Sequence, residues 1–277
     1  FLAILLPPFA VPALAWLYRQ PWCRLLSNYL AGENLRNTIN LILPGLALAV
    51  LLLPLLIGLF KTFGPGPGIV DLFANPDWIG GSPLESGSLY VFLNSILWFF
   101  GIHGAHALLP FTQALEHAVD LNATALAYGQ AATHPVNASF LGAFAFVGGS
   151  GATLALALAI LLFTQMRSLR LIALASLPLS LFNINEILLF ALPVIFNFRL
   201  LIPFLLAPMA GLVVALYAQA SGLIAPVTVA YPYTGLIGLN AYMASGGDWA
   251  AVALQACILT LDVLIYLPFV RRIAAHA

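Results

Sequence analysis

A single carboxylate, Glu186, lies in the apolar stretch "LFNINEILLFALPVIFNF", just after Asn183 and Asn185. A charged side chain at the centre of a membrane costs about 2.5–3.5 kcal/mol, so such residues usually face a cavity or a partner. Glu186 is therefore predicted to accept hydrogen bonds from a polar solute, and a neutral or Arg-paired structural acid is the alternative. For the two asparagines, solute contact and support of an interrupted backbone are equally good interpretations.

The stretch "WFFGIHGAHALLPF" contains a second polar group, because His103 stands between two glycines after an aromatic run. Glycine lets a backbone or a ligand approach closely, and histidine can donate to a hydroxyl or exchange a proton near neutral pH. His103 is therefore a candidate solute-binding residue, with a purely structural histidine as the alternative. His106 lies one helical turn on, but no third ligand follows at a usable spacing, so no metal site is predicted.

The stretch "YPYTGLIGLNAYMASGGDW" contains Tyr231, Tyr233 and Tyr242, whose rings could stack on a sugar face. A belt of aromatic residues at the membrane interface is the alternative. Asp248 precedes an apolar stretch and is expected to cap a helix. The sequence has no serine-elbow motif, Walker loop, HExxH motif or Cys-rich cluster, so neither catalytic residues nor a cofactor are predicted.

The composition identifies an integral membrane protein, since 62% of the 277 residues are hydrophobic and only 6% are charged. The formal net charge is zero, and the Lys and Arg residues form no basic stripe, so a nucleic-acid partner is not expected. Membrane lipid is the expected surrounding. Cys23 and Cys257 lack CxxC spacing and are expected to be small buried hydrophobic residues.

Apolar windows about 20 residues long predict an all-α, polytopic fold of transmembrane helices. These windows cover residues 1–17, 39–60, 89–111, 140–163, 200–217 and 250–270. The apolar segments 171–182 and 187–198 on either side of "NINE" are shorter, and helices of that length rise only roughly 18 Å, against a core of about 30 Å. They predict a broken or re-entrant helical hairpin, which is tolerated where the backbone faces protein or a water-filled cavity.

Residues 61–88 are rich in Gly, Pro, Asp and Ser and are predicted to form a linker. The linker separates a first unit, residues 1–60, from a second unit, residues 89–277, which contains all the candidate site residues. The sequence starts with Phe1 and is apolar from its first residue, so it is expected to begin inside a membrane span.

Four segments occur in the order and spacing of a known family: "LWFFGIHG", "GGSGATLALALAILLF", "FNINEILLFALPVIFNFRLLIPFLLAPM" and "ASGGDW…LDVLIYLPF". The chain resembles the membrane permease (enzyme IIC) of the bacterial phosphoenolpyruvate-dependent sugar phosphotransferase system, of the lactose/cellobiose/chitobiose type. The resemblance covers nearly the whole chain and is clearest over residues 89–270. The family has about ten membrane helices, which implies that the first three or so precede Phe1.

The resemblance implies a homodimer in the bacterial cytoplasmic (inner) membrane, with residues 1–60 belonging to an N-terminal interface domain and residues 89–277 forming the transport domain. The implied substrate is a disaccharide, β-linked as in cellobiose, chitobiose or lactose, which enzyme IIB then phosphorylates from its phosphocysteine. The family's site histidine falls on His103 and its site glutamate on Glu186, and both are implied to bind sugar hydroxyls. Asn185 is implied to lie beside the sugar.

The sequence departs from the family pattern at two places. Ile187 stands where the family usually has proline, and "YPYTGL" has Tyr233 in place of a stacking tryptophan, followed by Gly235 and Leu236 where Thr and Pro stand. These departures keep a second hypothesis open, that of a sugar-sensing membrane input domain without transport. An ion-coupled carrier unrelated to the family is a third hypothesis.

Overall fold

The structure is a computed structural model that describes residues 2–24, 40–63, 82–192 and 194–275. The chain divides into two compact units, Phe1–Leu72 and Phe73–Ala277. The first unit contains α1 (Leu2–Tyr18), the short 3₁₀ helix η1 (Pro21–Arg24) and α3 (Ile42–Phe63), and α1 contacts α3. Apolar side chains on both long helices are exposed in this unit, for example Trp16 and Leu51.

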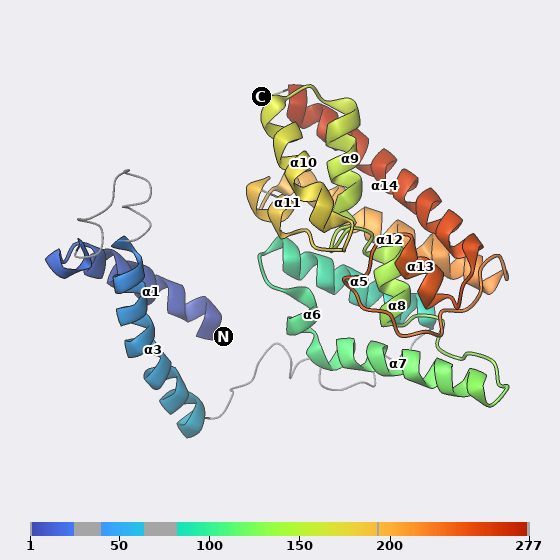
Figure 1. Cartoon of the computed structure of the whole chain (residues 1–277), viewed down its shortest axis with the longest axis horizontal. Coiled ribbons are helices and arrows are strands. Elements are labelled where there is room, and N and C mark those ends of the chain that lie inside the picture. Colours follow the sequence, from blue (N-terminus) through green and yellow to red (C-terminus); the bar gives the residue numbers. More distant parts are fainter. Residues whose placement is uncertain (1, 25–39, 64–81, 193, 276–277) are drawn as a thin grey trace. The chain divides into compact units, whose positions relative to one another are not determined.

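The second unit is built from helices that are repeatedly interrupted (Figure 1). In chain order they are α5 (Pro83–Phe99), α6 (Gly104–Ala107), α7 (Leu109–Ala127), α8 (Ala138–Phe140), the π-helix η4 (Leu141–Ala145), α9 (Thr153–Phe163), α10 (Arg167–Ser180), α11 (Glu186–Ala191), α12 (Phe198–Ala220), α13 (Leu239–Ala244) and α14 (Trp249–Ala275). The described residues contain helices and no strand, which confirms the predicted all-α fold.

The core of the second unit lies where α9 and α12 both pack against α14. Phe204 of α12, Leu156 of α9 and Tyr266 of α14 are fully buried there. On the outside of the same helices, apolar side chains such as Leu162 and Leu264 are exposed, as expected of a surface that faces lipid rather than water. Helices α12 and α14 are long and apolar enough to cross a membrane.

Helix α5 begins with a capping box, which explains why the chain becomes helical at Pro83. The Ser82 side chain accepts a hydrogen bond from the Glu85 amide at 3.3 Å, and the Glu85 carboxylate accepts one from the Ser82 amide at 2.8 Å. Helix α5 thus begins within the predicted linker 61–88. At the other end of the linker, α3 continues to Phe63, so both ends of the linker are helical. Most of that linker lies outside the described residues.

Two segments predicted as unbroken spans, 89–111 and 140–163, are interrupted in the structure. Helix α5 stops at Phe99 and is followed by Gly101 at φ 75°, a left-handed conformation that ends a right-handed helix. In the second segment, η4 gives way to a turn with Gly148, Gly149 and Gly151 all at positive φ, and the helix restarts as α9. Those glycines therefore shape a turn between two helical segments.

The predicted break at "NINE" is confirmed, because α10 ends at Ser180 and α11 begins at Glu186. Asn183 lies in the break at φ 59°, in the left-handed region that asparagine tolerates better than most residues. The second arm is shorter than the predicted 187–198. It ends at Ala191, and a new helix, α12, starts at Phe198, where the Asn197 side chain accepts a hydrogen bond from the Arg199 amide at 3.2 Å.

Two smaller expectations have opposite outcomes. Asp248 caps α14 as expected: its Oδ1 accepts a hydrogen bond from the Ala250 amide at 2.8 Å, and its Oδ2 accepts one from the Ala225 amide at 2.8 Å. The expected burial of Cys257 is wrong, since this thiol is exposed on the outer surface of α14. An apolar thiol is stable there because that surface is itself apolar. The side chain of Cys23 lies outside the described residues.

Candidate functional site

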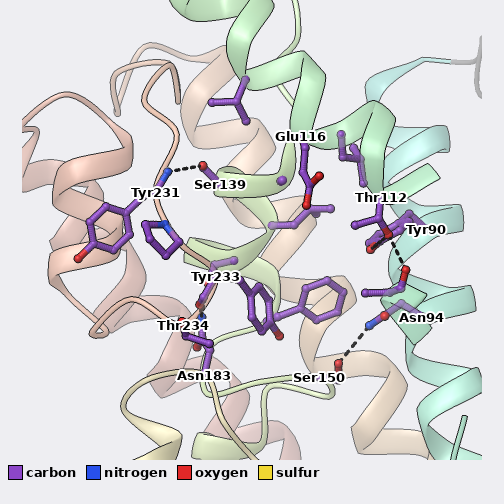
Figure 2. A pocket seen from close by; sticks show the side chains of 18 of the residues that line it. Tyr90, Asn94, Thr112, Glu116, Ser139, Ser150, Asn183, Tyr231, Tyr233 and Thr234 are labelled. Atoms are coloured by element: carbon purple, nitrogen blue, oxygen red, sulfur yellow. Dashed lines mark hydrogen bonds between the residues drawn. The ribbon is translucent and has the colours of Figure 1, made fainter. Parts of the chain in front are cut away.

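A cavity of about 710 Å³ lies in the second unit, where several of the helix interruptions meet (Figure 2). Its walls come from α5, the turn into α6, one face of α7, η4 and the turn after it, the α10–α11 break, and the loop over residues 230–234. The five site residues predicted from the sequence all line this cavity: His103, Asn183, Asn185, Glu186 and Tyr233.

His103 is the last residue before α6, and its side chain is exposed. Its Nδ1 accepts a hydrogen bond from the His106 amide at 3.3 Å. The neutral ring must therefore have its proton on Nε2, which is left to donate to a ligand. The ring lies 4.6 Å from the Trp98 ring and 3.9 Å from the His106 ring, measured between centroids.

The position of His103 depends on close packing of Gly104 against α5. A Cβ atom at Gly104 would lie 2.6 Å from the Asn94 carbonyl oxygen, closer than real Cβ contacts. Glycine is therefore required for the turn after α5 to fold back on that helix. Glu186 is the first residue of α11, directly after the break that separates α10 from α11. Its side chain is exposed and lines the same cavity as His103.

Asn183 is buried, with only 3% of its surface exposed, and it forms hydrogen bonds to three segments of the cavity wall. Its Oδ1 accepts a hydrogen bond from the Gly148 amide at 2.7 Å. Its Nδ2 donates to the Gly142 carbonyl at 3.1 Å and to the Tyr233 carbonyl at 2.8 Å. These bonds support the interrupted backbone, which is one of the two roles predicted for this side chain. Contact with a solute stays a prediction.

Asn185 holds the turn that precedes α9. Its Nδ2 donates to the Ser150 carbonyl and to the Thr153 hydroxyl, both at 2.8 Å. Gly149 packs directly on this side chain, since a Cβ there would lie 2.5 Å from the Asn185 Cγ. The side-chain oxygen of Asn185, Oδ1, accepts no hydrogen bond from the described residues, so it is left as an acceptor at the cavity wall.

The sequence interpretation missed two walls of the cavity, on α5 and α7. Tyr90, Asn94 and Trp98 are spaced by four residues on α5, and Thr112, Glu116 and Asp120 are spaced by four on α7. Residues four apart share one face of a helix, so this spacing was a usable signal. The two walls are joined by a hydrogen bond of 2.8 Å between the hydroxyls of Tyr90 and Thr112.

Aromatic rings give the cavity its apolar surface. The rings of Tyr233 and Phe146 lie 6.4 Å apart between centroids, and Trp98 contributes a third ring from α5. Rings of this kind pack well against the C–H faces of a cyclic ligand, while hydroxyls and carboxylates bind its polar edge. Tyr231 also lines the cavity, and its amide donates to the Ser139 hydroxyl at 3.1 Å.

The charges around the cavity have one sign. Three carboxylates line it, those of Glu116, Asp120 and Glu186, and no Lys or Arg does so within the described part of the chain. Over the same residues, no group of three or more metal-ligating side chains comes together. The arrangement suits an uncharged or cationic organic ligand that donates hydrogen bonds.

Comparison with known proteins gives concordant results. The family model "Phosphotransferase system, EIIC" matches residues 2–208. The chain is 33% identical, over 73% of its length and 45% of the relative's, to the cellobiose-specific EIIC component of the PTS system of Lactococcus lactis subsp. lactis (strain IL1403). It is 30% identical, over 69% of its length and 44% of the relative's, to the oligo-beta-mannoside-specific EIIC component of Bacillus subtilis (strain 168).

The fold is similar to a solved transporter structure, that of ChbC, the IIC component from the N,N'-diacetylchitobiose-specific phosphotransferase system. The TM-score is 0.67 at 29% identity, and the match covers 100% of this chain and 65% of the other. The chain spans about half the length of the curated relatives it matches. With the sequence segments, the interrupted helices and the family match in agreement, the chain belongs to the EIIC family of phosphotransferase-system membrane proteins.

Proposed function

We propose that this chain binds a β-linked disaccharide in the cavity and carries it across the bacterial inner membrane. Enzyme IIB then phosphorylates the sugar on the cytoplasmic side. Family membership and the sugar specificities in the names of its relatives support the proposal. The observation that carries it is the convergence of His103, Glu186 and Tyr233, from three separate segments, on one cavity. Its volume falls within the range of about 300–1,000 Å³ that is usual for small-molecule sites.

The side chains supply complementary contacts for a sugar. His103 donates from Nε2 to a sugar oxygen, and Glu186 accepts a hydrogen bond from a hydroxyl. Tyr233 packs on the apolar face of a sugar ring, as the tryptophan at this position does in the family pattern. The chain needs no phosphoryl-donating group of its own, because the family obtains the phosphoryl group from the phosphocysteine of enzyme IIB.

The membrane arrangement is part of the same proposal. The chain crosses the membrane several times, and α12 and α14 provide two of the crossings. Residues 89–277 are the moving transport domain, residues 1–60 belong to the interface domain of a homodimer, and 61–88 connect them. The division of the chain into two compact units supports this assignment, and the homodimer rests on the family resemblance.

The sensing hypothesis has less support than transport. It was prompted by Ile187 and by the altered "YPYTGL" segment. In the structure the helix break forms with Ile187 in place, and Tyr233 still presents an aromatic ring to the cavity. The solved structure that the chain resembles, ChbC, is named as a transporter.

Binding of cellobiose to the purified protein, measured by calorimetry, tests the assignment of the site. Loss of a hydrogen bond to a charged or strongly polar group costs about 1.5–3 kcal/mol, so Glu186→Gln and His103→Ala should each weaken binding about tenfold or more. The matched controls are Glu85→Gln, in which glutamine can keep the capping box, and His117→Ala on α7, which does not line the cavity. Equal binding by the site variants and the parent would refute the assignment.

Transport is tested separately in vesicles that contain the intact protein. Accumulation of sugar phosphate should require phosphorylated enzyme IIB on the inside and should not respond to a proton gradient. Uptake driven by a proton gradient without a phosphoryl donor would instead support an ion-coupled carrier.

A further inference from the structure

Three carboxylates make the cavity wall rich in hydrogen-bond acceptors. The carboxylates of Glu116 and Asp120 lie on α7, one turn apart, and Glu186 lies on α11. Each accepts no hydrogen bond and forms no ion pair with the described residues. They also do not converge on a point where one metal ion would bind, since the described residues contain no such group. The negative charge is therefore distributed over a space the size of an organic ligand.

The side chains of two buried asparagines add further hydrogen-bond acceptors to the cavity wall. Asn94 is 2% exposed and Asn185 is 3% exposed, and both line the cavity. Asn94 donates to the Ser150 hydroxyl at 3.2 Å, and Asn185 donates to the Ser150 carbonyl at 2.8 Å. The protein thus uses the donors of both side chains, and their Oδ1 atoms accept no hydrogen bond from the described residues. These two oxygens are not fully enclosed by protein, so they are available to accept hydrogen bonds from a ligand in the cavity.

The Glu116 carboxylate points into this space. Figure 2 shows it reaching from α7 toward the space that Tyr233 and Ser150 also line. Thr112 lies one helical turn before Glu116. The Thr112 hydroxyl is hydrogen-bonded within the protein, to the Ala105 carbonyl at 3.0 Å and to the Tyr90 hydroxyl at 2.8 Å. The Glu116 side chain is therefore held on a helix face that is fixed against α5, with its own oxygens unused.

We propose that the cavity prefers a disaccharide that carries a protonated amine, such as the β-1,4-linked dimer of glucosamine, and that Glu116 receives the ammonium group. An ammonium group supplies three donors and a positive charge, whereas a hydroxyl supplies one donor and adds acceptors of its own. Hydrogen bonds between ionised partners are also about twice as strong as those between neutral groups. This inference rests on the proposed sugar-binding function and adds the chemical class of the sugar.

Two ligands of the same linkage test the inference, because cellobiose and the glucosamine dimer differ only by hydroxyl and ammonium at C2. Dissociation constants are measured for both with the intact protein in detergent, below the pKa of the amines. The parent should bind the glucosamine dimer about tenfold more tightly, which corresponds to about 1.4 kcal/mol. In Glu116→Gln the ratio of the two constants should fall several-fold toward one, and in the control Glu85→Gln it should not change.

A measurement on the parent alone makes the test independent of how well the variant folds. A preference that depends on charge should shrink as ionic strength rises, whereas binding of cellobiose should respond little to salt. Equal affinity for the two ligands, or a ratio that Glu116→Gln and salt both leave unchanged, overturns this inference while the sugar-binding proposal stands. Failure of the parent to bind either ligand refutes the proposed function and this inference with it.

Discussion

Glu186 and Asp262 are two carboxylates in apolar segments of the same unit, and their surroundings differ completely. Glu186 is the first residue of α11, next to a helix break, and it is exposed at a cavity. Asp262 lies near the middle of α14, is fully buried, and has no hydrogen-bond partner for either carboxylate oxygen among the described residues.

The difference shows what a break in a helix provides. Inside an unbroken helix the backbone amides are bonded to carbonyls of the same helix, so they cannot stabilise a buried acid. Asp262 lies between Ile258 and Tyr266 on one face of α14, and the Tyr266 hydroxyl donates to the Gly151 carbonyl at 2.6 Å, not to the acid. At Glu186 the chain is interrupted, and the space beside it admits water or a ligand. An acid at the break can therefore accept hydrogen bonds from a ligand, whereas an acid inside the helix is a stability cost.

The largest effect is expected when the packing that supports the break is removed. Gly149 has φ 96° and leaves no room for a Cβ beside Asn185. Gly149→Ala should combine left-handed backbone strain, about 1–2 kcal/mol, with a steric clash, and lower the free energy of unfolding by about 3 kcal/mol or more. Denaturation of the purified protein in detergent, followed by circular dichroism, gives this value.

Gly129→Ala is the matched control for this prediction. Gly129 has φ 71°, but nothing lies within 4 Å of the position that a Cβ atom would take there. Only the backbone strain of about 1–2 kcal/mol applies at this residue. If the two variants lose the same stability, close packing of Gly149 on Asn185 does not support the break.

A smaller effect of opposite sign is expected at Asp262. Leucine has nearly the same branched shape as aspartate, with methyl groups in place of the two oxygens. A buried polar group without a hydrogen-bond partner destabilises a protein by about 1–3 kcal/mol, and an apolar group of the same shape removes that cost. Asp262→Leu should therefore raise the midpoint of thermal unfolding and leave cellobiose affinity within about twofold of the parent.

Thr260→Val controls for a general effect of added apolar surface on α14. Thr260 is exposed and its hydroxyl donates only to the Ala256 carbonyl, at 2.8 Å, so this variant should change stability by less than about 0.5 kcal/mol. A loss of stability in Asp262→Leu would show that the acid forms a favourable interaction in the folded protein, and the contrast with Glu186 would then be wrong.

The smallest effect is expected when the family's proline is restored next to Glu186. Ile187 is the second residue of α11, where the amide has no acceptor in the helix and proline loses no hydrogen bond. Ile187→Pro should change the free energy of unfolding by less than about 1 kcal/mol. Its stability is measured in the same denaturation assay.

Leu189→Pro provides the contrast, because the Leu189 amide donates to the Asn185 carbonyl at 2.9 Å. Loss of that bond, together with the ring clash, should cost about 3 kcal/mol or more. Similar costs at the two positions would mean that the geometry of the break depends on isoleucine at position 187.

The sequence predicted the broken hairpin, and the five site residues that it proposed line one cavity, but it did not predict two further breaks. Glu186 and the half-length apolar arms indicate an interruption because neither the charge nor the length fits a membrane span. The interruptions after Phe99 and before Thr153 have no such signal. Their segments are apolar and long enough to cross, and glycine is common in membrane helices. Whether a glycine adopts positive φ depends on what packs against it.

The acids on α7 illustrate a second limit. Glu116 and Asp120 make their segment too polar for a membrane span, and their four-residue spacing places them on one face. That face lines the cavity because Thr112 bonds Tyr90 of α5, a contact between residues that are 22 positions apart. The same charges on an outer surface would not line a cavity.

Sequence alone determined the membrane class, the helical fold, the break at "NINE" and the family, because hydrophobicity, segment length and short motifs are local properties of the chain. Only the tertiary structure decided that five scattered residues share one cavity, that Asn183 and Asn185 use their amide groups to hold its walls, and that Asp262 is buried without a partner among the described residues. These features depend on contacts between residues distant in the chain, and such contacts are fixed by packing.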